Sequence, residues 1–125
     1  MIPYQYIVLR CVPKVDREEF VNVGVVVYAQ QADFLATAVD VDRDRLARFA
    51  PDLDIDAVER ALAAVDAVCR GLTSRGGPDL PSLGKRFGWL AAPRSTVVQS
   101  GPVHGGLTDD PARILEELSS RLVST

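Results

Sequence analysis

The chain has 125 residues, of which 47% are hydrophobic and 25% are charged, and its formal net charge is −3 at pH 7. This length fits a single domain, residues 1–125, whose core needs no metal or disulfide. The composition argues against wholesale disorder, and the acidic balance argues against a nucleic-acid partner. The longest apolar run, around Val23 to Ala29, is far too short to span a membrane.

The front of the chain has the pattern of three β-strands. Tyr4 to Val12 is rich in β-branched and aromatic residues, Phe20 to Ala29 is rich in valine, and Phe34 to Val41 follows after a short link. Such a short link favours an antiparallel hairpin. We therefore expect a mainly antiparallel sheet.

The two-residue alternation of strands assigns side chains to faces. On the first strand, one face carries Tyr4, Tyr6, Val8 and Arg10. On the second strand, the expected faces are Val21, Val23, Val25 and Val27 on one side, and Phe20, Val26 and Tyr28 on the other. The second of these faces is too apolar to be half exposed. We expect helices to cover it, or a second subunit in a homo-oligomer.

Three polar or small residues stand out within these strands. Asn22 and Gly24 interrupt the valine-rich strand, where they could line a cleft, although a β-bulge is the favoured interpretation. Arg10 needs a partner if it is buried, and Asp40 is the obvious candidate within the strands.

The rest of the chain is predicted to be mainly helical. Asp42 or Asp44 can cap a short helix that Pro51 ends, and Asp54 can cap a longer one. The longer helix carries an apolar stripe, which is Ile55, Val58, Leu62, Val65, Cys69 and Leu72. Two further helices are expected, with the apolar residues Leu83, Phe87 and Leu90 in the first and Ile114, Leu115, Leu118 and Leu122 in the second.

The fold class predicted from these elements is α+β, with a mainly antiparallel sheet of about four strands and helices packed on it. The last helix begins at Asp110 and Pro111, because proline is favoured at the first helical position. A short fourth strand is expected over Ser95 to Ser100. The two cysteines, Cys11 and Cys69, have no CxxC spacing and no neighbouring histidine, so we expect two buried thiols, a cytoplasmic location, and neither a metal nor a cofactor.

The segment from Pro93 to Pro111 is the main candidate for function, because loops of this composition often carry binding residues. It contains the only histidine, together with arginine, hydroxyl groups, an amide and several glycines. The candidate surface residues, including two from the strands, are Arg94, Ser95, Gln99, Ser100, His104, Arg10 and Asn22. Arg94 could anchor an anion or a partner, or could tie the loop to a carboxylate such as Asp109.

Three motifs resemble a bacterial family of small proteins, the domain-of-unknown-function family 3037. They are FVNVGVVV at 20–27, RFGWLAAPRSTVVQSGPVH at 86–104 and GLTDDP at 106–111, and the start Tyr4-x-Tyr6 followed by Arg10 fits the same pattern. The resemblance implies no established activity. It does imply that the members are companions of a HipA-like kinase.

Two functions follow as expectations. The leading one is a non-catalytic accessory or interaction module that binds a protein partner, with a HipA-like kinase as the candidate. The alternative is a small enzyme or sensor that binds a nucleotide or another phosphorylated ligand through Arg94, Ser95 and His104. No complete catalytic constellation is recognisable in the sequence, and this favours the first function.

Overall fold

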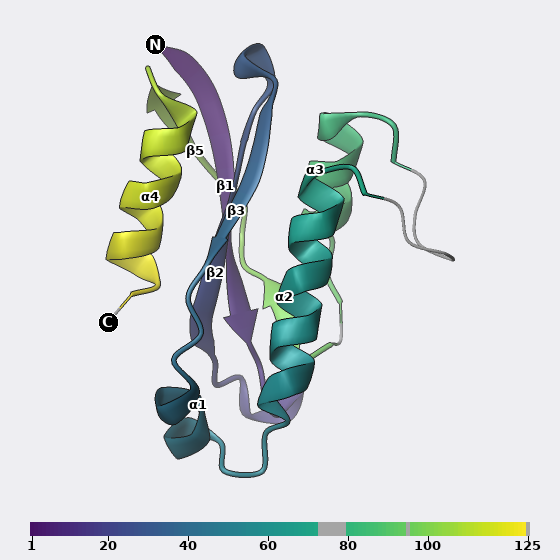
Figure 1. The fold of residues 1–125 in the computed structure, drawn as a ribbon, viewed down its shortest axis with the longest axis vertical. Helices are drawn as coiled ribbons and strands as arrows, with labels where there is room; N and C mark the ends of the chain where they lie inside the picture. The colour runs from purple at the N-terminus through teal and green to yellow at the C-terminus, as the bar shows by residue number, and fades with distance from the viewer. Residues whose placement is uncertain (73–79, 95, 125) are drawn as a thin grey trace.

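The fold is described by a computed structural model that covers residues 1–72, 80–94 and 96–124 (Figure 1). The strands are β1 (Ile2–Cys11), β2 (Val21–Ala29), β3 (Phe34–Val39), β4 (Val98–Ser100) and β5 (His104–Thr108). The helices are α1 (Arg43–Phe49), α2 (Ile55–Cys69), α3 (Leu83–Ala91) and α4 (Pro111–Leu122). Single 3₁₀ turns, η1 (Val15–Arg17) and η2 (Gln30–Ala32), join the first three strands.

The sheet is antiparallel and has β1 at its centre. Its order is β3-β2-β1-β4, and β5 pairs with the same edge of β1 as β4 does. Because β1 is long, its end pairs with β4 from Leu9 to Cys11, while its start pairs with β5 from Ile2 to Tyr6. The predicted α+β class is therefore confirmed, with five strands rather than four in the part of the chain that the structure describes.

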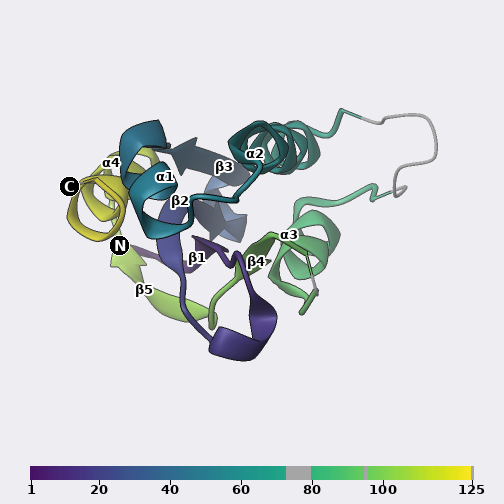
Figure 2. The same cartoon turned by 90° about the horizontal axis from the view of Figure 1, so that it is seen from below.

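Helices lie on both faces of the sheet (Figures 1 and 2). On one face, α2 and α3 cover a core that includes Ile7, Leu9, Val26, Leu62 and Phe87. On the other face, α4 covers a smaller core of four buried residues, which are Val25, Val27, Leu118 and Val123. The expected helical cover over Val26 and Tyr28 is confirmed, because Val26 is fully buried and the ring of Tyr28 stacks on Phe87.

A β-bulge in β2 changes the predicted faces of that strand. Leu9 pairs with Gly24 and Arg10 pairs with Asn22, so Val23 is an extra residue on β2. The bulge interpretation of Asn22 and Gly24 is thus confirmed. The prediction that four valines share a face was wrong, because the extra residue puts Val21 and Val23 with the α2–α3 core, whereas Val25 and Val27 lie under α4.

Phe20 is also displaced from the face predicted for it. It lies before the bulge, it is 44% exposed, and its ring contacts Arg10 instead of packing beside Val26 and Tyr28.

The helix starts follow the predicted caps. The carboxylates of Asp42, Asp54 and Asp110 accept hydrogen bonds from backbone N–H groups in the first turns of α1, α2 and α4, and Ser82 does the same for α3. The α2 stripe faces the sheet from Ile55 to Cys69. The helix ends there, with Gly71 in a left-handed conformation (φ 72°), so that Leu72 lies beyond the helix and is exposed.

The segment predicted to be a flexible loop contains a strand. β5 spans His104–Thr108, and its two glycines are paired in the sheet. Gly106 leaves room for the Tyr4 side chain, because a Cβ at this position would lie 2.7 Å from the Tyr4 hydroxyl unless that ring moved. None of the helices within 1–72, 80–94 and 96–124 has the length and apolar character that crossing a bilayer requires.

Candidate functional site

One half of the α4 face of the sheet is left open. Helix α4 packs mainly against β2 and β3. The side chains of β1 on this face remain partly exposed. Figure 2 shows α4 beside the sheet in this end-on view. We call this row the β1 stripe and define it as Tyr4, Tyr6, Val8 and Arg10 of β1 together with His104 of β5. The stripe lies on a paired, five-stranded sheet, which fixes the positions of its members.

Three rings of the stripe form a continuous aromatic contact. The ring centroids of Tyr4 and Tyr6 are 6.2 Å apart, and those of Tyr6 and His104 are 5.1 Å apart, in stacked arrangements. His104 is exposed, whereas both tyrosines are half-buried against the α4 core. The result is a continuous row of aromatic rings whose positions are set by β-pairing.

Arg10 forms the cationic end of the stripe. Its guanidinium carbon lies 4.2 Å from the centroid of the Phe20 ring, and it packs closely over Gly101. Its Nε atom is buried and has no hydrogen-bond partner among the described residues. Asp40, the candidate partner from the sequence, accepts a hydrogen bond from the Ser124 hydroxyl instead. Arg10 is therefore held by an aromatic ring and not by a carboxylate.

Two amide side chains flank Arg10 on the neighbouring strands. Asn22 pairs with it on β2 and Gln99 on β4. The Asn22 side-chain amide donates to the carbonyl of Leu122 at 3.1 Å, which ties β2 to the end of α4, and its Oδ1 atom is buried without a partner. The Gln99 side-chain amide donates to the carbonyl of Thr96 at 3.0 Å. Three of the candidate residues thus lie side by side, and two of them carry unsatisfied polar atoms.

Arg94 and Ser100 lie elsewhere. The guanidinium carbon of Arg94 lies over the Trp89 ring, 3.7 Å from its centroid, and the guanidinium donates to the Trp89 carbonyl at the end of α3. Burial lowers the pKa of Arg94. The Ser100 hydroxyl donates to the carbonyl of Ala91, also in α3. Trp89 packs against the α2–α3 core, so both side chains are tied to the face of the sheet opposite the β1 stripe.

The predicted site is therefore divided by the sheet. Arg10, Asn22, Gln99 and His104 lie on the side of the β1 stripe, and the structure does not bring Arg94 to His104. Ser95 lies outside the described residues. The sequence did place Tyr4, Tyr6 and Arg10 on one face, but it missed Phe20, because a single extra residue at Val23 moves it.

Thiol and metal chemistry find little support in the described residues. Burial, with a smaller contribution from Asp66, raises the pKa of the Cys69 thiol to about 12, and burial also raises that of Cys11. Both thiols are thus protonated near neutral pH and are poor nucleophiles. Within residues 1–72, 80–94 and 96–124, no three side chains of histidine, cysteine, aspartate or glutamate are grouped as metal ligands.

Comparison with known proteins identifies the family of the chain. The family model described as "Protein of unknown function (DUF3037)" matches residues 6–123, which is nearly the whole chain. No curated protein and no solved structure matches the chain. The matched range contains Tyr6, Arg10, Phe20 and His104 and begins just after Tyr4.

Proposed function

The chain belongs to the DUF3037 family, and on that premise we propose that it is a non-catalytic accessory module that binds a protein partner through the β1 stripe. The observation that carries this proposal is the row of partly exposed Tyr4, Tyr6, His104 and Arg10 side chains on one rigid strand pair. Tyrosine and arginine are the residue types that contribute most to protein interfaces.

The electrostatics of Arg10 indicate what the partner presents to this end of the stripe. The guanidinium is positioned by Phe20 and forms no ion pair with a carboxylate of the described chain. A carboxylate from a partner would satisfy such a guanidinium with paired, charge-assisted hydrogen bonds. We therefore expect an acidic side chain next to an apolar one on the partner surface.

The family resemblance suggests the first partner to test, a HipA-like kinase. The alternative function, a nucleotide or phosphorylated ligand bound by Arg94, Ser95 and His104, has weaker support. Arg94 is engaged by Trp89, and His104 is engaged by Tyr6 across the sheet. A phosphate could not reach both side chains without rearrangement of one of them.

The test is co-purification of the chain with a purified HipA-like kinase, followed by calorimetric measurement of the dissociation constant. His104→Ala and Leu107→Ala form a matched pair, because both residues are exposed on β5 but lie on opposite faces of the strand. Arg10→Ala removes the cationic end of the stripe. We expect Arg10→Ala to cost about 2 kcal/mol of binding free energy, as a central interface arginine does.

The controls distinguish an error in the proposed partner from an error in the proposed surface. A thermal melt of each variant shows whether it is folded before its binding is compared. A wild-type chain that captures no kinase would show that the kinase is the wrong partner. Kinase binding that survives both His104→Ala and Arg10→Ala, but not Leu107→Ala, would show that the β1 stripe is the wrong surface.

A further inference from the structure

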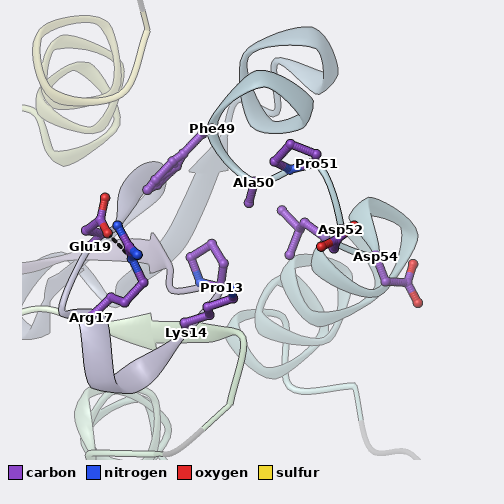
Figure 3. A pocket seen from close by; sticks show the side chains of 10 residues that line it. Pro13, Lys14, Arg17, Glu19, Phe49, Ala50, Pro51, Asp52 and Asp54 are labelled. Atoms are coloured by element: carbon purple, nitrogen blue, oxygen red, sulfur yellow. Dashed lines mark hydrogen bonds and ion pairs between the residues drawn. The ribbon is translucent and has the colours of Figure 1, made fainter.

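A cleft lies at the end of the molecule where the connection between β1 and β2 faces the connection between α1 and α2 (Figure 3). Its cavity measures about 380 Å³. This volume is within the range of small-molecule sites in proteins. The cleft is separate from the β1 stripe, because none of the stripe residues lines it.

Half of the residues that line the cleft are apolar, and one wall is held by short-range structure. Pro13 contributes to one wall, Phe49, Ala50 and Pro51 contribute to the other, and Leu53 also lines the cleft. The Ala50 N–H donates to the Leu46 carbonyl and the Leu53 N–H donates to the Ala50 carbonyl, at 2.8 and 3.0 Å. Proline on both walls further restricts the backbone. The cavity is therefore preformed, which lowers the entropic cost of binding a ligand.

Most of the charged groups at the rim are already engaged. Arg17 pairs with Glu19 on one wall. On the other wall, Asp54 accepts a hydrogen bond from the Ala57 N–H as the cap of α2, and it lies 3.8 Å from Arg60. These pairs neutralise one another and leave little net charge for a ligand.

Two rim charges of opposite sign remain available. Lys14 lies beside Pro13, and Asp52 lies on the facing wall (Figure 3). Both are exposed, and neither forms an ion pair with another residue that the structure describes. They do not form an ion pair with each other either, so a ligand that engages both must carry one charge of each sign.

We propose that this cleft binds a short apolar peptide with free termini, of dipeptide size. Its carboxylate would pair with Lys14, its ammonium with Asp52, and its aliphatic or aromatic side chains would cover Phe49 and Pro13. The apolar lining residues and the opposite charges on facing walls are each satisfied by the same ligand.

Calorimetric titration with the dipeptide Leu-Leu tests the proposal directly. N-acetyl-Leu-Leu lacks the ammonium group and Leu-Leu amide lacks the carboxylate, so each removes one of the two charge contacts. We expect Leu-Leu to bind, and each blocked form to bind about tenfold more weakly, as the loss of one charge-assisted contact implies. Lys14→Ala should abolish the difference between Leu-Leu and its amide, and Asp52→Asn should abolish the difference between Leu-Leu and its acetylated form.

Matched variants outside the cleft serve as controls. Lys85→Ala on α3 and Glu116→Gln on α4 remove exposed charges of the same signs and should leave Leu-Leu affinity unchanged. Phe49→Ala should weaken binding of all three peptides, and a thermal melt should show that the variant is folded. Equal affinity for free and blocked peptides, unchanged affinity in both charge variants, or no binding of Leu-Leu to the folded wild-type chain would each overturn the proposal. None of these results depends on a protein partner at the β1 stripe.

Discussion

Gly106 and Tyr4 are in direct contact across the β1–β5 pair, and a Cβ added at Gly106 would lie 2.7 Å from the Tyr4 hydroxyl oxygen. The tyrosine ring thus lies over Gly106, its partner on β5, which has no side chain. This contact explains the glycine within a strand. The orientation of Tyr4, and with it the aromatic part of the β1 stripe, therefore depends on the absence of a Cβ at position 106.

Gly106→Ala should therefore displace the Tyr4 ring while leaving the chain folded. The atoms that would clash are at the far end of a half-buried side chain, which can swing outward, so we expect a loss of about 1 kcal/mol or less in the free energy of unfolding. The near-ultraviolet circular dichroism from the stacked tyrosines should change, and binding at the β1 stripe should weaken.

Gly24→Ala provides the contrast for this experiment. Its Cβ would meet the Ala38 carbonyl oxygen at 3.2 Å and the Leu9 side chain at 3.1 Å, inside the sheet. A backbone carbonyl within the sheet cannot move aside as an exposed side chain can. The loss in the free energy of unfolding should therefore be larger, about 1–3 kcal/mol. If Gly106→Ala destabilises the chain as much as Gly24→Ala does, Tyr4 is more rigidly held than its exposure indicates.

Leu62→Ala tests the central contact between α2 and the sheet. Leu62 is 3% exposed and belongs to the core that includes Val26 and Phe87. Truncation should lower the free energy of unfolding by about 2–5 kcal/mol, because it removes buried methyl groups and leaves a cavity. Arg60→Ala, at an exposed position of the same helix, should change it by about 0.5 kcal/mol or less. Urea unfolding of both variants checks the pair, and an unchanged midpoint for Leu62→Ala would contradict the placement of this helix face.

The sequence was sufficient for the helices because their signals are local. A capping carboxylate such as Asp54 acts within one helical turn, and an apolar stripe at helical spacing repeats along a single helix. Asp110, which precedes Pro111, is a capping carboxylate of the same kind for α4. These elements form where their own residues dictate, so a pattern along the chain was enough to place them.

The strands were harder to predict because their faces depend on distant pairing. One extra residue at Val23 reverses the face of the sheet assigned to Phe20. This reversal is visible only in the pairing of Arg10 with Asn22. β5 was missed because Gly105 and Gly106 are typical of loops, and the reason for Gly106 is a tyrosine about a hundred residues earlier in the chain. The candidate site was divided for the same reason, since His104 pairs with Tyr6 while Arg94 turns back onto α3.

The buried thiol of Cys69 should make stability depend on pH in the alkaline range. Its pKa in the folded chain is about 12, above the ordinary value of 9.0, so the folded state holds the proton more tightly than the unfolded state. The stabilising contribution is complete below pH 9 and is lost as the pH rises from 9 toward 12. The unfolding free energy should fall with pH in this window, and less steeply in Cys69→Ala, although Cys11 retains part of the slope.

Alkylation provides an independent measurement of the same burial. Iodoacetamide reacts with the thiolate, so neither cysteine should be modified in the native chain at pH 8, whereas both should be modified in urea. Mass spectrometry reads out the number of adducts. Rapid modification of native Cys69 would contradict its assignment as a buried, protonated thiol.

Substitution of Arg94 tests whether this arginine stabilises the fold or binds a partner. Its guanidinium lies over the Trp89 ring and donates to the carbonyl of the same residue. Asp109, its candidate partner from the sequence, pairs instead with the N-terminal ammonium group at 3.2 Å. These contacts tie the segment after α3 to the end of that helix. We therefore expect Arg94→Ala to lower the free energy of unfolding by about 1 kcal/mol, the scale of one cation–π contact with a hydrogen bond.

The same variant should leave binding at the β1 stripe intact, because Arg94 is attached to the opposite face of the sheet. Trp89 is the only tryptophan of the chain, so its fluorescence reports directly on the loss of the stacked guanidinium. Arg94→Lys keeps the charge but not the planar stacking, and it should recover only part of the stability. A variant that keeps both its melting temperature and its Trp89 emission, yet loses partner binding, would reverse this assignment and return Arg94 to the functional surface.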